Sequence, residues 1–208
     1  MKKYLTEFIG TFFLVMIVGV TVIKVEGRAM APFAIGAVLM VMIFAGGHIS
    51  GAHYNPAVTI SVWLRGRCAT ADVPGYLIAQ LAAAAAAAYV ALFLKGQPEV
   101  PPLEIQLLPA LLAEFFGTFA LTYVVLNTAT AKGTSGNSFY GLAIGATVLS
   151  MAFAFGAMSG GAFNPAVAIG LALMHVTKAA NLWILFIAEV AAAIVSASVF
   201  RFTNPDDK

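Results

Sequence analysis

Two similar stretches decide the fold of this chain: SGAHYNPAV at residues 50–58 and SGGAFNPAV at residues 159–167. In each, Asn-Pro-Ala opens a short apolar run, residues 57–64 in the first and 166–174 in the second. Asn is a preferred helix N-cap, and Pro is preferred at the first helical position. A helix of this length reaches roughly 12–14 Å, about half of a bilayer. Each stretch therefore predicts a half-helix that begins at its Asn residue.

The composition surrounding these stretches is that of a membrane protein. The chain has 208 residues, of which 61% are hydrophobic and only 10% are charged, whereas a soluble domain has about 25% charged residues. This excludes a soluble domain and a disordered chain, and the net charge of +2 offers no basic surface for nucleic acid. One cysteine, Cys68, allows neither an internal disulfide nor a cysteine-based metal site.

Six apolar stretches are long enough to cross a membrane, at residues 4–23, 29–47, 73–94, 107–127, 139–158 and 179–200. With six spans, both termini lie on the same side. Seven of the eleven basic residues fall on that side: Lys2, Lys3, Arg65, Arg67, Lys132, Arg201 and Lys208. The other four are Lys24, Arg28, Lys95 and Lys178. By the positive-inside rule, we expect a multi-pass protein of the plasma (inner) membrane with both termini in the cytoplasm.

The chain contains an internal repeat. TEFIGTF at residues 6–12 returns as AEFFGTF at 113–119, and AIGA at 34–37 returns as AIGA at 143–146. The Asn-Pro-Ala stretches keep the same order, 109 residues apart. Each copy holds three spans, an odd number, so the second copy must insert upside down relative to the first. The sequence thus predicts one channel domain, residues 1–208, made of inverted repeats 1–95 and 107–203.

Inversion brings the two half-helices in from opposite sides, so that their N-termini meet near the membrane midplane. Each N-terminus carries about half a positive charge, which repels cations and protons. Irregular backbone at this depth is tolerated where it lines a watery cavity. The predicted cavity therefore passes small, neutral molecules that form hydrogen bonds.

The sequence GHISGAHYNPAVT at residues 47–59 resembles the first signature loop of the aquaporin (major intrinsic protein) family. The motifs around Glu7 and Glu114 and the second Asn-Pro-Ala also match. The resemblance implies an all-α membrane protein with six transmembrane helices and two re-entrant half-helices. It implies a homotetramer in membrane lipid whose partners are water and small neutral solutes, with no cofactor, metal, nucleic acid or enzymatic activity. The implied pore motifs are Asn55, Pro56, Ala57, Asn164, Pro165 and Ala166.

The resemblance also places a selectivity filter. Most family members carry Arg directly after the second Asn-Pro-Ala, where this chain has Val167. The companion positions are Ile35, Ala152 and Gly161. A wide, apolar filter without a cation favours glycerol and urea, and extends to ammonia, hydrogen peroxide or metalloid hydroxides. A water-selective channel and a proton-coupled secondary transporter remain the alternatives.

The remaining polar residues within the spans allow two interpretations, a structural role and a role in proton transport. Ionisable groups at membrane depth are costly and are usually functional. The resemblance implies that Glu7 and Glu114 brace the backbone of the re-entrant loops, whereas a proton-coupled transporter would use them as proton carriers. His48 is expected to line the pore, and His53 to pack beside the loop. Glu189, within the sixth span, is expected to contact the loops near the half-helices.

Overall fold

The computed structural model describes residues 1–23, 29–99 and 101–207. Within these residues the secondary structure is helical, except for an isolated β-bridge between Leu103 and Thr177. The predicted all-α fold is therefore confirmed. Lys24, Arg28 and Lys208, which enter the orientation prediction, lie outside the described residues.

Six helices are long and apolar enough to span a membrane, and they correspond to the six predicted spans. They are α1 (Lys2–Val22), α2 (Ala31–Ser50), α4 (Val73–Leu94), α5 (Leu107–Val125), α6 (Tyr140–Ser159) and α8 (Leu182–Thr203). Single turns of 3-10 or π helix flank them at η2 (Thr70–Asp72), η3 (Leu126–Thr130), η4 (Lys132–Thr134) and η5 (Ala179–Asn181). The chain is a multi-pass membrane protein.

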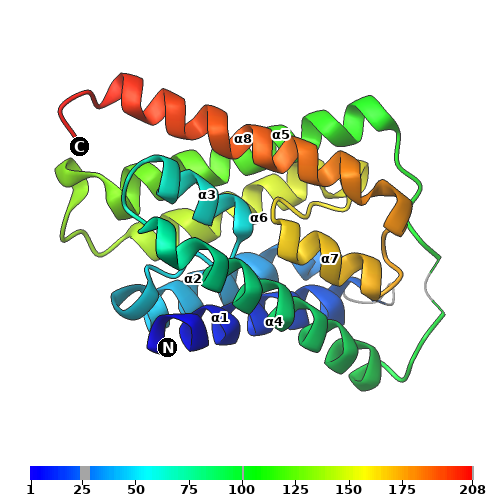
Figure 1. Cartoon of the computed structure of the whole chain (residues 1–208). Coiled ribbons are helices and arrows are strands. Elements are labelled where there is room, and N and C mark those ends of the chain that lie inside the picture. The colour runs from blue at the N-terminus through cyan, green and yellow to red at the C-terminus, as the bar shows by residue number, and fades with distance from the viewer. Residues whose placement is uncertain (24–28, 100, 208) are drawn as a thin grey trace.

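Two short helices, α3 (Pro56–Leu64) and α7 (Pro165–Leu173), lie between the long ones. Figure 1 shows them one beyond the other along the bundle, with both chain termini at the end nearer α3. We call this end the terminal face. Each half-helix packs against the last long helix of the other repeat, α3 against α8 and α7 against α4. The two halves of the chain are thus interlocked around the half-helices.

Small residues allow the long helices to approach closely. The crossing of α2 and α6 is the tightest example: a Cβ atom added to Gly36 would lie 2.7 Å from the carbonyl oxygen of Gly145. In α4 the alanines that face α1 and α7 are fully buried, among them Ala84, Ala87 and Ala91. Such close approach is typical of helices packed within a membrane.

Large apolar side chains cover the outside of the bundle. Their exposure to water would be unfavourable. Phe93 is 75% exposed and Ile78 is 69% exposed. Exposed apolar residues of this size continue on α1, α2, α5, α6 and α8. A surface of this kind suits a hydrocarbon environment, so the polar groups described next are the exception in this molecule.

Candidate functional site

The two half-helices begin at Asn55 and Asn164, as the sequence predicts. The Oδ1 atom of Asn55 accepts hydrogen bonds from the backbone N–H groups of Ala57 at 2.8 Å and Val58 at 3.4 Å. The Oδ1 atom of Asn164 accepts one from Ala166 at 2.9 Å. These bonds satisfy N–H groups that the first helical turn leaves without a partner. Both N-termini are therefore capped and lie in the interior.

Each asparagine also ties its half-helix to the opposite loop. Asn55 donates from Nδ2 to the carbonyl oxygen of Phe163 at 2.8 Å, and Asn164 donates from Nδ2 to the carbonyl oxygen of Tyr54 at 2.9 Å. Both carbonyls belong to residues in the left-handed region, with φ of 48° at Phe163 and 49° at Tyr54. An asparagine amide has two N–H groups. One N–H of each asparagine is thus left for the cavity that both side chains line.

A buried glutamate holds the first loop behind its asparagine. Glu7 on α1 is fully buried, and its carboxylate accepts four hydrogen bonds. The donors are the Ser50 hydroxyl at 2.7 Å, the backbone N–H of His53 at 2.9 Å and of Tyr54 at 2.7 Å, and Gln80 Nε2 at 2.9 Å. These are the loop contacts expected of Glu7. They leave the carboxylate facing donors of the loop rather than the cavity.

The second loop repeats this arrangement with one change. Glu114 accepts hydrogen bonds from the Ser159 hydroxyl at 2.6 Å and from the backbone N–H groups of Ala162 at 3.0 Å and Phe163 at 2.6 Å. Position 189 corresponds to Gln80 but carries a glutamate. The Oε1 atom of Glu189 accepts a hydrogen bond from the backbone N–H of Asn164 at 2.8 Å. The expected loop contact of Glu189 is thus present, and it falls on the pore asparagine itself.

A narrow cavity of about 30 Å³ runs past the two asparagines. This volume holds about two water molecules, since one needs roughly 10–15 Å³ of such space. The cavity is lined by Leu14, Val18, Ile35, Leu39, Ile43, Ala52, His53, Tyr54, Asn55, Val58, Leu121, Val125, Ile144, Val148, Gly161, Ala162, Asn164 and Val167. No Lys, Arg, Asp or Glu is among these described residues. The lining is a mostly apolar wall with polar groups concentrated at the two loops.

The structure brings three of the four predicted filter residues to this cavity, namely Ile35, Gly161 and Val167. The fourth, Ala152, is half-buried against the apolar core and does not line the cavity. It lies one helical turn beyond Val148 on α6, so it continues the same row of residues past the point where the cavity ends.

His48 differs from expectation, whereas His53 is buried beside the loop as predicted and also lines the cavities. His48 is exposed and lines neither the narrow cavity nor the larger one at the terminal face, so the structure does not support its predicted place on the pore wall. His53 lines both cavities, and its Nδ1 lies 3.2 Å from the Thr59 hydroxyl. The polar ring beside the first asparagine is therefore His53, which the sequence assigned to packing.

A larger cavity of about 810 Å³ opens at the terminal face and shares Ile43, His53 and Val125 with the narrow one. We call it the vestibule. Its wall includes Arg67, Cys68 and residues 128–132, next to the end of α3. It lies next to the narrow cavity, at the face that carries both termini.

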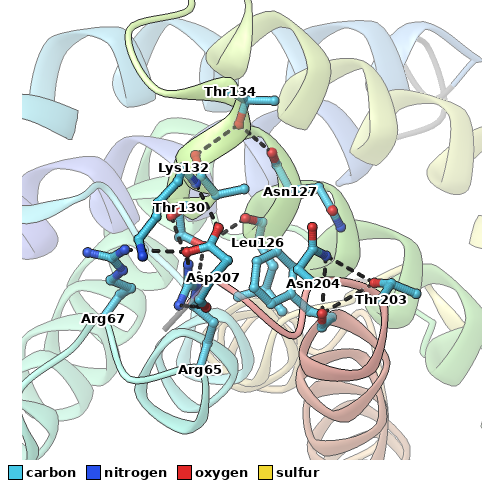
Figure 2. Close-up of polar contacts among 12 residues, drawn as sticks. Arg65, Arg67, Leu126, Asn127, Thr130, Lys132, Thr134, Thr203, Asn204 and Asp207 are labelled. Atoms are coloured by element: carbon cyan, nitrogen blue, oxygen red, sulfur yellow. Dashed lines mark hydrogen bonds and ion pairs between the residues drawn. The ribbon is translucent and has the colours of Figure 1, made fainter.

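The C-terminal tail contacts the end of α3 through Asp207 and Arg65, as Figure 2 shows. The side chain of Arg65 is 1% exposed, and its Nη2 lies 2.6 Å from Asp207 Oδ1. Arg65 also donates to the Thr130 carbonyl at 3.1 Å and stacks over the Phe200 ring at 4.7 Å. The backbone N–H of Lys132, which donates to Asp207 at 2.7 Å, and the Arg65 guanidinium hold the pKa of Asp207 below its usual value. The tail thus joins α3, α8 and the loop after α5. Sequence reasoning missed this cluster because its partners are up to 142 residues apart.

The sequence matches the family model described as Major intrinsic protein over residues 1–200. It is 35% identical to the glycerol uptake facilitator protein-like 6 of Lactiplantibacillus plantarum, with all of both chains covered. It is 36% identical to aquaporin NIP1-4 of Oryza sativa, covering 98% of this chain and 78% of that one, and 33% identical to nodulin-26 of Glycine max, covering 100% and 80%.

The fold also resembles a solved structure. An X-ray structure of the aquaglyceroporin from Plasmodium falciparum aligns with a TM-score of 0.77 over 99% of this chain and 95% of that chain. The identity is 22%, so this likeness bears on the fold alone. The family match and the relatives of 33–36% identity lead to one conclusion: the chain belongs to the major intrinsic protein family, whose members are membrane channels and not enzymes.

Proposed function

We propose that this protein is a passive channel that conducts water and small uncharged solutes through the narrow cavity and the vestibule. The observation that carries the proposal is the lining of the narrow cavity, in which two asparagine amides and the His53 ring interrupt a mostly apolar wall. A solute that enters the narrow cavity exchanges some hydrogen bonds with water for those of Asn55, Asn164 and the loop carbonyls, and it meets no fixed charge among the described residues that line this cavity.

The same geometry argues for exclusion of ions and protons. The N-termini of α3 and α7 both point at the centre of the cavity, and each adds roughly half a positive charge there. Glu7 and Glu114 do not offset this charge within the cavity, because neither lines it and both are engaged with loop donors. A cation would therefore lose its hydration shell without gaining compensating ligands.

Val167 and Gly161 argue for a broad solute range. Val167 contributes a small apolar side chain to the wall, and Gly161 contributes none. Neither position therefore places a side-chain hydrogen-bond donor or a charge in the cavity. Glycerol and urea are the solutes we propose first, followed by ammonia, hydrogen peroxide and metalloid hydroxides. The similarity to a glycerol uptake facilitator-like protein supports glycerol.

A water-selective channel is the second candidate, since the narrow cavity holds only about 30 Å³. Stopped-flow light scattering of proteoliposomes decides between the two. We expect faster swelling in glycerol and in urea than for empty liposomes, with a low activation energy. Water flux without solute flux would favour the second candidate. Solute accumulation against its gradient, driven by a pH difference, would reject the passive mechanism and favour a proton-coupled transporter.

The proposal also covers the oligomeric state of the protein and its orientation in the membrane. We propose a homotetramer in the plasma (inner) membrane with the terminal face in the cytoplasm. The Lys and Arg residues at that face, including Lys3, Arg65 and Lys132, support the orientation. Crosslinking in native membranes and the labelling of Cys68 described below test these two points.

A further inference from the structure

Glu114 and Glu189 form a pair of buried carboxyl groups directly behind the second pore asparagine. Both side chains are 0% exposed, and their carboxyl groups are neighbours because they accept hydrogen bonds from two consecutive backbone N–H groups, those of Phe163 and Asn164. Glu114 already receives three hydrogen bonds from the loop, and Glu189 Oε1 receives one from the Asn164 backbone. The other oxygen, Oε2 of Glu189, has no hydrogen-bond partner among the described residues.

Among the described residues, the elements packed around this pair place no Lys or Arg side chain to neutralise a second negative charge. The elements packed against α5 and α8 are α3, α6, α7, η3 and η5, and none contains Lys, Arg, Asp or Glu within its bounds. The titratable groups on these elements and on α5 and α8 are Tyr123, Tyr140, Arg201 and the two glutamates. Arg201 is exposed and is twelve residues from Glu189, about 18 Å along the helix. Two adjacent ionised carboxylates at this depth would be very unfavourable.

The first repeat indicates where the compensating proton sits. There, Glu7 has the same three kinds of loop donor plus a fourth, the amide Nε2 of Gln80 at 2.9 Å. Glu189 is the counterpart of Gln80. A carboxyl group can act as that fourth donor only when it is protonated. The unpartnered oxygen of Glu189 is the atom that would carry this hydrogen.

We infer that Glu189 is held protonated at neutral pH, donates this proton in a hydrogen bond to the Glu114 carboxylate, and positions Asn164 through its other oxygen. Glu189 is thus a positioning residue of the pore. Loss of the proton would remove a donor from Glu114 and set two like charges against each other behind the second loop. The pore asparagine would then lose its fixed place, and solute conduction would fall.

Infrared difference spectroscopy of the purified full chain tests the inference through the proton itself. We expect wild type at neutral pH to show the C=O stretch of a protonated carboxylic acid, sensitive to H/D exchange, and Glu189→Gln to lack it. The amide of Glu189→Gln can both donate to Glu114 and accept from Asn164, so folding should be kept. Gln80→Glu is the matched control, since it recreates the pair in the first repeat and should add a second such band. Absence of the band in wild type, or its persistence in Glu189→Gln, would overturn the inference.

The pH dependence of water permeability gives a second readout. Wild type should lose permeability at alkaline pH, where the shared proton leaves, whereas the permeability of Glu189→Gln should not change with pH across the same range. Identical pH profiles for the two proteins would contradict the positioning role. The infrared result is independent of which solutes pass, so it stands or falls separately from the proposed solute range.

Discussion

Asn55 and Phe163 lie 108 residues apart in the chain, yet the amide Nδ2 of one donates to the carbonyl oxygen of the other at 2.8 Å. In the same way, the amide Nδ2 of Asn164 donates to the carbonyl oxygen of Tyr54 at 2.9 Å. The two half-helices are thus fixed to each other at their N-termini by side chains that also cap them. The positions of the two free amide N–H groups depend on this double link.

Removal of one asparagine should therefore weaken both the fold and the pore. Asn164→Ala loses a helix cap and the bond to Tyr54, and we expect unfolding in detergent to become easier by about 1–2 kcal/mol. Water permeability should fall as well. Asn181→Ala is the control, because Asn181 occupies the N-cap position of α8 without a side-chain cap bond. Equal effects of the two substitutions would show that the cap bond and the link contribute nothing.

The crossing of α2 and α6 should be intolerant of a single methyl group. In Gly36→Ala the new Cβ would lie 2.7 Å from a backbone carbonyl, which cannot move without shifting α6. We expect a loss of about 1–3 kcal/mol in stability. Gly156→Ala on α6 meets nothing within 4 Å and should be tolerated. Thermal denaturation followed by light scattering compares the two variants. Equal Tm values would contradict the tight contact between α2 and α6 at Gly36.

The contact between the tail and Arg65 should contribute to stability at neutral pH and disappear in acid. Because the pKa of Asp207 is lowered in the folded state, its contribution is present above the ordinary aspartate pKa and is lost as pH falls through the lowered one. Asp207→Ala should lower Tm by about 2–4 °C. The exposed neighbour Asp206 supplies the control, Asp206→Ala, which should leave Tm unchanged. An Asp207→Ala protein with wild-type Tm would mean that the tail is held by other contacts.

Cys68 offers a test of orientation, since it is the one cysteine of the sequence and lines the vestibule. A membrane-impermeant maleimide should label it from the cytoplasmic side only. Burial, and then the negative charge of Asp72, raises the pKa of this thiol. Its labelling rate should therefore reach half of its maximum at a higher pH than that of a free thiol, whose ordinary pKa is about 8.5. Labelling of intact cells from outside, absent in Cys68→Ser, would reverse the assigned orientation.

The local parts of the site could be predicted from the sequence because they depend on neighbouring residues. An Asn-Pro pair before a short apolar run specifies a capped half-helix, and both half-helices begin where this pattern places them. The six spans follow from apolar runs of membrane-spanning length. The bonds from Asn55 to Phe163 and from Arg65 to Asp207 could not be predicted, because nothing in the local pattern brings such distant residues together.

There is a physical reason why His53, and not His48, lines the cavities. On α2 the residues that line the two cavities are Ile35, Leu39, Ile43, Gly47 and Ser50, three or four apart on one face of the helix. His48 follows Gly47 by one residue, which turns its side chain about 100° away from that face. His53 lies beyond the end of α2, where Gly51 adopts φ of 84° and the chain leaves the helix. Its place depends on this turn rather than on helical spacing.

The central claim is that a neutral, apolar wall at Val167 lets solutes larger than water through the cavity between the two asparagines. The most direct test is the ratio of glycerol to water permeability in proteoliposomes containing wild type, Val167→Ala or Val167→Arg. We predict measurable glycerol permeability in wild type, at least as much in Val167→Ala, and a ratio reduced at least tenfold in Val167→Arg, since each tenfold needs only about 1.4 kcal/mol of added barrier. A ratio that is the same in all three proteins would contradict the account.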